Sequence, residues 1–221
     1  MTSRLGPLLA IDGVVLLLAG TVLHPMQADP AVAEAAYAEY AADRYWVASH
    51  LLQLAGTWAT IASLLLSAQR LEAEVAAPLA RLGSAFGIAG IAAAAALQAV
   101  DGVALKAMVD RWAAAPEPEM AALFAATYAV RQVEVGLAAT TCLLLGLMAA
   151  ILGLAFVIDG RVPRWAGILG IAGGVSTAAS GVVIANAGFS RLSVAVNMPA
   201  VLVLMAFTVA LGMLDRRGRR N

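Results

Sequence analysis

Long runs of apolar residues, separated by short polar segments, are the dominant pattern along this chain of 221 residues. A helix that crosses a hydrocarbon core of about 30 Å needs roughly 20 predominantly apolar residues. The pattern therefore predicts an all-α, polytopic membrane protein with a single membrane domain over residues 1–221. Six stretches are long enough to span, and they cover about residues 5–24, 45–68, 82–105, 135–158, 165–186 and 195–214.

Two of the polar segments between these spans have helical patterns of their own. Residues 31–43 are rich in alanine and place acidic residues at helical spacing, which predicts a short surface helix. Residues 117–134 run into the fourth span without a helix breaker, and Pro116 and Pro118 suit the start of a helix. We expect both segments on the outer side of the membrane.

Arginine residues are distributed unevenly between alternate segments. If the N-terminus is cytoplasmic, the inner segments contain Arg4, Arg70, Arg81, Arg161, Arg164, Arg216, Arg217, Arg219 and Arg220. The outer segments contain Arg44, Arg111, Arg131 and Arg191, which are interspersed with acidic residues. Because short cytoplasmic loops carry an excess of Lys and Arg, this bias predicts that both termini lie in the cytoplasm.

An internal similarity relates the second and third spans to the fourth and fifth. The segment RLGSAFGIAG at 81–90 parallels RWAGILGIAG at 164–173, and Tyr45 falls opposite Tyr128 at the same offset of 83. Such an offset favours a parallel repeat about an axis along the membrane normal. Chance identity is the alternative in a chain so rich in Ala, Gly and Leu.

The composition supports a membrane protein and excludes several functions. Hydrophobic residues make up 62% of the chain, charged residues 13%, and the mean hydropathy is +0.86. The net charge is zero, so nothing favours nucleic acid as a partner. Cys142 is the only cysteine, which excludes an internal disulfide. The expected partners are the lipid bilayer, a small molecule or lipid, and a further copy or another subunit of a membrane complex.

Polar residues recur at one depth, near the outer ends of the spans. Because polar groups in lipid face the interior of a bundle, these residues predict an outward-opening pocket. The expected lining residues are His50, Gln53, Gln98, Asp101, Arg131 and Glu134. Arg131 would engage an anionic group or pair with Asp101, and Glu134 would pair with Lys106. The alternative is a polar plug that only holds the helices together.

The lengths of the spans also indicate where two further sets of charged residues lie relative to the membrane. Asp12 falls near the middle of the first span, where it would act as a proton or cation relay below the pocket, or would be protonated and hydrogen-bonded. Lys106, the only lysine, and Asp110 fall beyond the end of the third span. They are expected to form ion pairs at headgroup level or to be part of the relay.

Several functions remain open from the sequence. The main hypothesis is a protein that binds a small ligand or cofactor in the outer pocket. His24 and His50 are the candidates for a metal or haem b site, since imidazole is a common axial ligand of haem iron. A small proton-coupled transporter and an accessory subunit of a larger complex are further alternatives. An enzyme is not indicated, because no nucleophile or metal set is complete.

Three segments carry a resemblance to a known group. They are DGVALKAMVDRWAAAP, EVGLAATTCLLLGLMAAILGLAF and PRWAGILGIAGG. These resemble six-helix membrane proteins of high-GC bacteria that are grouped as a domain of unknown function. The resemblance covers most of the chain and implies the six-helix topology and a bacterial inner membrane. It implies no activity and no functional residue.

Overall fold

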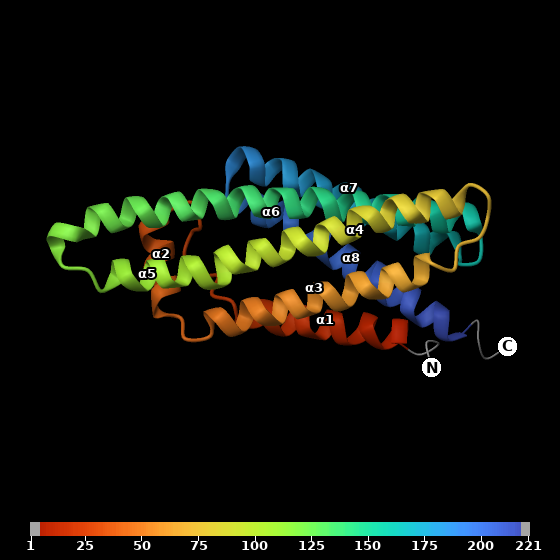
Figure 1. The fold of residues 1–221 in the computed structure, drawn as a ribbon, viewed down its shortest axis with the longest axis horizontal. Coiled ribbons are helices and arrows are strands. Elements are labelled where there is room, and N and C mark those ends of the chain that lie inside the picture. The colour runs from red at the N-terminus through yellow and green to blue at the C-terminus, as the bar shows by residue number, and fades with distance from the viewer. Residues whose placement is uncertain (1–4, 218–221) are drawn as a thin grey trace.

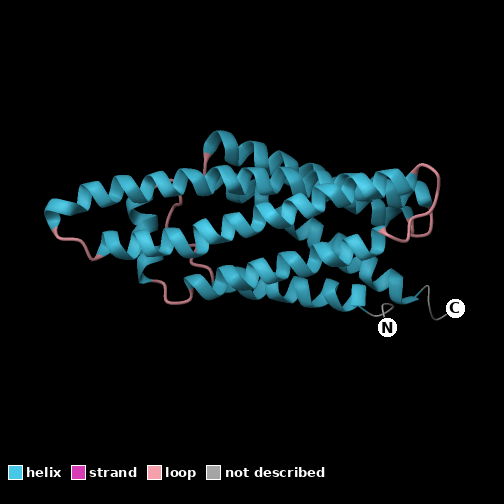
Figure 2. Ribbon diagram, in the orientation of Figure 1, coloured by secondary structure: helices cyan, strands magenta, loops and turns pink. Residues whose placement is uncertain are grey.

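The computed structural model describes residues 5–217, with side chains as far as Leu214. Within that range the chain consists of helices joined by short turns and loops (Figures 1 and 2). In chain order the helices are α1 (Leu5–Leu23), α2 (Ala33–Ala42), α3 (Trp46–Ala68), α4 (Ala76–Gln98), the π-helix η1 (Ala99–Leu105), α5 (Lys106–Ala113), α6 (Glu117–Asp159), α7 (Arg164–Ala187) and α8 (Arg191–Arg217).

Six helical stretches of the described chain are long and apolar enough to cross a membrane, which confirms the predicted all-α bundle of six spans. Five of them are the single helices α1, α3, α6, α7 and α8. The remaining one is continuous from α4 through η1 into α5, over Ala76–Ala113. Both expected surface segments are helical, one as α2 and the other as the first part of α6.

Glycines allow the helices to approach closely. A Cβ atom added to Gly174 of α7 would clash with the backbone nitrogen of Ala150 in α6. A Cβ atom added to Gly56 of α3 would lie 2.7 Å from the carbonyl oxygen of Gly13 in α1. Lipid tails give helices no hydrophobic drive to associate, so such small residues make the dispersion contacts that hold a bundle together.

The two helix pairs of the proposed repeat do not pack equivalently. α6 and α7 make the most extensive helix–helix contact of the bundle, whereas α3 and α4 make only a limited one. α3 packs chiefly on α1, and α4 packs chiefly on α6. The matching segments 81–90 and 164–173 therefore do not occupy equivalent packing environments.

One end of the bundle extends well beyond the other helices (Figure 1). α6 has 43 residues and is about 65 Å long at 1.5 Å per residue, roughly twice the thickness of a hydrocarbon core. The continuous helix α4–η1–α5 runs beside it, and α2 packs against their extended part. Tyr37, Tyr40, Trp46, Val109 and Trp112 belong to the apolar cluster that holds this end together. Both termini lie at the opposite end (Figure 1).

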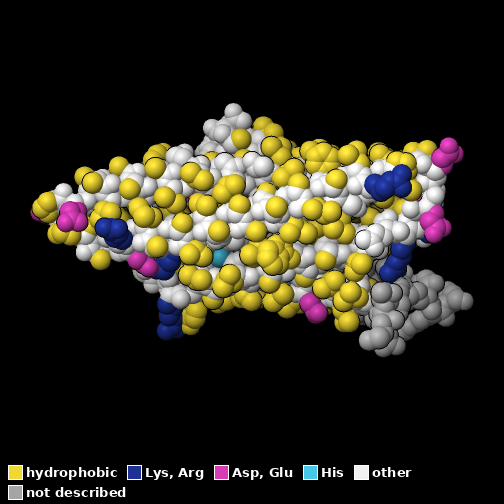
Figure 3. All heavy atoms as spheres, in the orientation of Figure 1, with side chains coloured by type: hydrophobic (Ala, Val, Ile, Leu, Met, Phe, Trp, Pro, Cys, Tyr) yellow, Lys and Arg dark blue, Asp and Glu magenta, His cyan; other side chains and the backbone are white. Residues whose placement is uncertain are grey.

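The outside of the bundle is apolar. Val15, Ile88 and Val175 are more than half exposed, as expected for side chains in contact with lipid. Figure 3 shows hydrophobic side chains along the middle of this face and most of its charged side chains near the two ends. Asp12 lies on α1 with its side chain exposed. Its expected position below the pocket is therefore wrong, because the helix face that carries Asp12 turns away from the bundle interior.

Candidate functional site

His50 and Asp101 form a buried pair between α3 and η1. The Nε2 atom of His50 lies 3.1 Å from Oδ2 of Asp101, and the His50 side chain is only 2% exposed. The Nδ1 atom lies 2.7 Å from the carbonyl oxygen of Trp46 and 3.2 Å from Oγ of Ser49. The Ser49 hydroxyl itself donates to the Trp46 carbonyl. An acceptor therefore faces each ring nitrogen, an arrangement that an imidazolium with two N–H groups satisfies on both sides.

The π-helical turn brings this pair together. η1 covers residues 99–105, and its wider turn includes Asp101 and Gly102. A Cβ atom on Gly102 would lie 2.7 Å from Cβ of His50, so glycine is what allows η1 to lie directly against α3. The indole Nε1 of Trp46 donates to the carbonyl oxygen of Asp101 at 2.9 Å. Single π-helical turns inside α-helices are frequent at functional sites.

Arg131 and Glu134 form a second buried pair one turn apart on α6. The Nη1 atom of Arg131 lies 3.3 Å from both carboxylate oxygens of Glu134, whose side chain is only 2% exposed. The Nη2 atom donates to the hydroxyl oxygen of Tyr40 at 3.2 Å. The guanidinium carbon lies 4.6 Å from the ring centre of Phe189 and 5.3 Å from that of Tyr40. Two aromatic rings and a carboxylate thus fix the orientation of this arginine.

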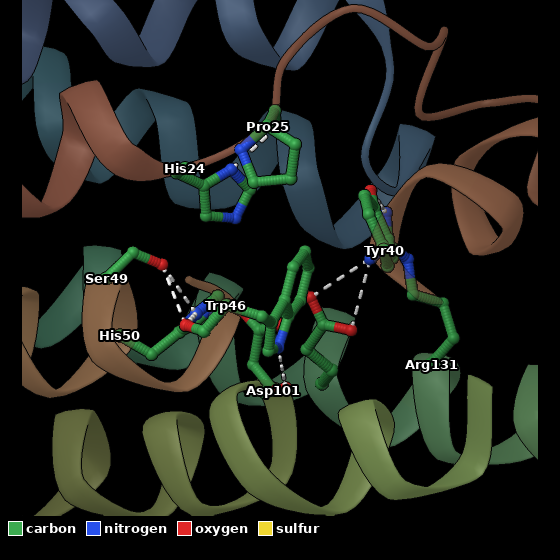
Figure 4. A network of polar contacts seen from close by, with 9 residues as sticks. His24, Pro25, Tyr40, Trp46, Ser49, His50, Asp101 and Arg131 are labelled. Carbon is green, nitrogen blue, oxygen red and sulfur yellow. Dashed lines mark hydrogen bonds and ion pairs between the residues drawn. The ribbon is translucent and has the colours of Figure 1, made fainter. Parts of the chain in front are cut away.

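The two pairs form one network, because Asp101 and Arg131 both interact electrostatically with the buried carboxyl group of Glu134. The network runs from His50 on α3 through the two acids to Arg131, and on to Tyr40 of α2. Figure 4 shows the labelled side chains converging from these separate elements. Arg131 is paired with Glu134, so the expected pairing of Arg131 with Asp101 is wrong.

His24 lies against this network at the end of α1. Its ring centre is 5.0 Å from that of His50 and 4.9 Å from that of Trp46, and its Nδ1 is 2.7 Å from the carbonyl oxygen of Pro25 (Figure 4). Burial lowers the pKa of His24, and the nearby His50 lowers it further. The two imidazole rings are in direct contact, which leaves no gap for a porphyrin between them. The pair therefore does not fit a bis-histidine haem.

The acidic and histidine side chains do not suggest a metal site either. Across the described residues, no group of three or more His, Cys, Asp or Glu side chains is arranged to hold a metal ion. His24 and His50 are thus better explained as parts of an aromatic stack above the buried acids.

Lys106 binds the C-terminal end of helix α2, a contact that the sequence did not indicate. Its Nζ donates to the carbonyl oxygens of Tyr40 and Ala41 and to Oδ1 of Asp110, at 3.1, 2.9 and 2.7 Å. The expected pairing of Lys106 with Glu134 is wrong, because Lys106 turns toward the C-terminus of α2. Its ion pair with Asp110 joins residues four apart on one helix.

A pocket of about 300 Å³ opens beside Arg131. It lies between the start of α2, the Tyr128–Val135 part of α6 and the turn between α7 and α8. The lining residues are Pro30, Ala31, Ala33, Tyr128, Arg131, Gln132, Val135, Ala187, Gly188 and Phe189. Arg131 is the one charged residue among them. The pocket therefore presents a cation, an amide and a phenol between apolar and aromatic walls.

A second pocket, of about 400 Å³, lies on the other side of Pro30 and includes Tyr40. Its charged groups already have partners within the protein. The carboxylate of Glu39 accepts the backbone N–H groups of Gln27 and Ala28, at 2.9 and 3.0 Å. Arg191 lies 2.8 Å from Asp29. The pocket at Arg131 is therefore the stronger candidate for binding a charged ligand.

The six residues expected to line one pocket are separated by the structure. Four of them, His50, Asp101, Arg131 and Glu134, form the network. Of the six, Arg131 alone lines either of these two pockets. Gln53 packs against Gly20 of α1. Gln98 is on α4, where its Oε1 atom is buried without a hydrogen-bond partner.

Tyr40 and Phe189 are the members of the site that sequence reasoning missed. Tyr40 lies on the surface helix α2, and Phe189 follows α7 in a turn. Both residues belong to segments outside the predicted spans. The signal that could have found Tyr40 is its aromatic ring on the alanine-rich face of a helix, where Tyr37 and Tyr40 are three residues apart.

No protein-family model, curated protein or solved structure matches this chain, so its function has to be inferred from the site itself.

Proposed function

We propose that this multi-pass membrane protein binds a small ligand with an anionic group, and that Arg131 holds this group in the pocket on α6. The observation that carries the proposal is the pocket lining, in which a buried guanidinium is the sole charged group. Bacterial inner-membrane location, with the pocket on the extracytoplasmic side, is part of the proposal.

The geometry of Arg131 suits recognition of an anion. A guanidinium has five N–H donors, and the contacts with Glu134 and Tyr40 are three in number. Its planar group is fixed between aromatic rings, so little side-chain entropy would be lost on binding. A carboxylate or a phosphate monoanion can accept two parallel N–H groups from such a fork.

The pocket walls favour a ligand that also has an apolar part. Tyr128 and Phe189 offer ring faces, Gln132 offers an amide, and the rest of the lining is mostly small and apolar. The site lies at the end of the bundle where α2 covers the helices. Both a soluble acid and the headgroup of an anionic lipid have the anionic group and apolar part that this pocket requires.

Two alternatives have less support from the structure. A proton-coupled transporter with Asp12 as relay requires this carboxylate to face the bundle interior, whereas it is exposed on α1. A purely accessory subunit needs no pocket and no fixed arginine beside one. The membership in a bacterial six-helix group remains a prediction.

Titration of benzoate tests the proposal, with the protein in nanodiscs of phosphatidylcholine. Benzoate supplies a carboxylate for Arg131 and a ring for the aromatic walls, and benzamide is the matched neutral compound. We expect calorimetry to show binding of benzoate and at least tenfold weaker binding of benzamide. Equal affinity for both compounds would overturn the proposal.

The variants are chosen so that the protein still folds. Arg131→Gln alone leaves Glu134 buried without its partner, so the double variant R131Q/E134Q removes both charges together. It should lose benzoate binding, while Arg191→Gln, beside the second pocket, should retain it. A parallel series with phosphatidylglycerol in the nanodisc, read by native mass spectrometry, distinguishes a lipid headgroup from a soluble anion.

A further inference from the structure

Helix α1 carries an acidic side chain on the face that the rest of the bundle leaves uncovered. Asp12 is exposed, and it is the only charged residue of this helix. At 1.5 Å per residue it lies about 10 Å from Leu5 and about 16 Å from Leu23, the two ends of the span. Figure 3 shows an acidic side chain over α1 with hydrophobic side chains around it. Asp12 therefore faces the hydrocarbon interior of the membrane.

An acid at this position has a large free-energy cost unless it is paired. Acidic residues in membrane spans almost always face the interior of a bundle and interact with another polar group. Within the described chain, no hydrogen bond or ion pair involves the Asp12 side chain. Long Lys and Arg side chains can extend to the headgroups, but an aspartate is too short to bridge about 10 Å. The partner of Asp12 must therefore come from another molecule that covers α1.

The uncovered face of α1 has the spacing of a coiled-coil seam. Its exposed residues alternate at intervals of three and four, and they are Leu5, Leu8, Asp12, Val15, Ala19 and Val22. Apolar residues with this period of 3.5 form the contact line between two helices that coil around each other. The glycines of α1 face the other way, where Gly13 and Gly20 pack on α3. α1 thus has a second contact face.

A second copy of the same chain fits this face. Two copies have the same orientation in the membrane, so a two-fold axis along the membrane normal places each residue of α1 at the depth of its counterpart. Asp12 then meets its own counterpart. Two carboxyl groups are complementary when a proton lies between them, because one group donates and the other accepts. In coiled coils, a single polar residue at such a position fixes the register and the number of helices.

We propose that two copies of this chain associate through the exposed face of α1, and that their Asp12 carboxyl groups form a hydrogen-bonded pair in the interface. Lipid tails give helices no hydrophobic drive to associate, so this pair and the packing of the aliphatic side chains stabilise the dimer. No residue of α1 lines the pocket at Arg131, so the dimer does not depend on ligand binding there.

Disulfide cross-linking in the membranes of the expression host locates the interface. Each variant also carries Cys142→Ser, so that the introduced cysteine is the only one in the chain. Val15→Cys, three residues from Asp12, should form a covalent dimer under mild oxidation. Ile88→Cys is the matched control, because Val15 and Ile88 are 57% and 62% exposed and lie on different helices. It should remain monomeric.

Substitutions of Asp12 test the carboxyl pair. Asp12→Asn retains a donor and an acceptor, so the dimer should persist. Asp12→Leu removes both, and because the side chain is exposed to lipid, the monomer should fold as well as the wild type. Interhelical hydrogen bonds lead us to expect about tenfold weaker association for D12L. Counting photobleaching steps of labelled protein in phosphatidylcholine vesicles, over a range of protein-to-lipid ratios, measures the dimer fraction.

Three results would contradict the proposal. A wild-type chain that is monomeric at every protein-to-lipid ratio would overturn it and assign this face to a different membrane protein. Cross-linking of I88C without cross-linking of V15C would overturn it by locating the interface on another helix. Equal association of D12L and the wild type would overturn the carboxyl pair, since the two acids would then contribute nothing to the dimer. Thermal unfolding in detergent checks that all variants are folded.

Discussion

Lys106 lies with its Nζ atom 3.1 Å from the carbonyl oxygen of Tyr40, at the C-terminus of α2. The last carbonyl groups of a helix have no partners within the helix, and a nearby lysine can satisfy them. The only lysine of the chain thus attaches the surface helix to α5. Because the Tyr40 hydroxyl also accepts from Arg131, this attachment positions a hydrogen-bond partner of the arginine in the candidate site.

Replacement of Lys106 by methionine should detach α2 from the bundle. Methionine retains the length of the chain but donates no hydrogen bonds, and hydrogen bonds from a charged group contribute roughly 1.5–3 kcal/mol each. We expect faster hydrogen exchange over residues 33–42 while the six spans remain protected. Lys106→Arg should keep much of the protection, and equal exchange in K106M and the wild type would contradict the capping role.

A single added methyl group should disrupt the contact between η1 and α3. Gly102→Ala places a Cβ atom 2.7 Å from Cβ of His50, and neither atom is at the flexible end of a side chain. We expect a loss of about 1–3 kcal/mol in unfolding free energy, measured by denaturation in detergent.

The matched control for this change is Gly136→Ala on α6. An added Cβ at Gly136 meets no atom within 4 Å, so the helix should gain up to about 1 kcal/mol from the better helix former. Opposite signs for the two substitutions are expected. A G102A protein as stable as the wild type would show that η1 can move away from α3 without cost.

The pattern of the sequence predicts the six spans, but not which way each helix faces. Arg131 and Glu134 are three residues apart, so their common face follows from helical spacing alone. Asp12 shows the limit, because α1 is apolar around most of its circumference and its exposed face is set by packing on α3. The π-helical turn at Ala99–Leu105 depends on contacts with Trp46 and His50, which are distant in sequence.

His24 should make the stability of the protein fall as the solution becomes acidic. Burial lowers its pKa from the ordinary value of 6.5, so the unfolded chain binds a proton at a higher pH than the folded chain does. The contribution of neutral His24 to folding stability is therefore fully present above about pH 7. It is lost as the pH falls through 6.5 toward the lower pKa of His24 in the folded state.

Thermal unfolding followed at about pH 7.5 and at about pH 5.5 measures this decline. His24→Gln cannot titrate, so the difference between the two conditions should shrink in this variant. A decline of the same size in the wild type and in H24Q would show that another group is responsible. The control variant is Thr21→Val, at the end of α1. Gln27→Glu is less suitable, because the backbone N–H of Gln27 donates to the carboxylate of Glu39.

His50 and Asp101 should behave as a coupled pair in a double-mutant cycle. Removing one partner leaves the other buried and unpaired, which typically costs about 3–5 kcal/mol. Removing both leaves no uncompensated charge in this half of the network. We therefore expect His50→Gln and Asp101→Asn each to destabilise the protein strongly, and the double variant to be little worse than either one. Denaturation of all four proteins in one detergent gives the coupling free energy. Additive losses would mean that the 3.1 Å contact contributes no interaction of its own, and that His50 is held by its other partner, the Trp46 carbonyl.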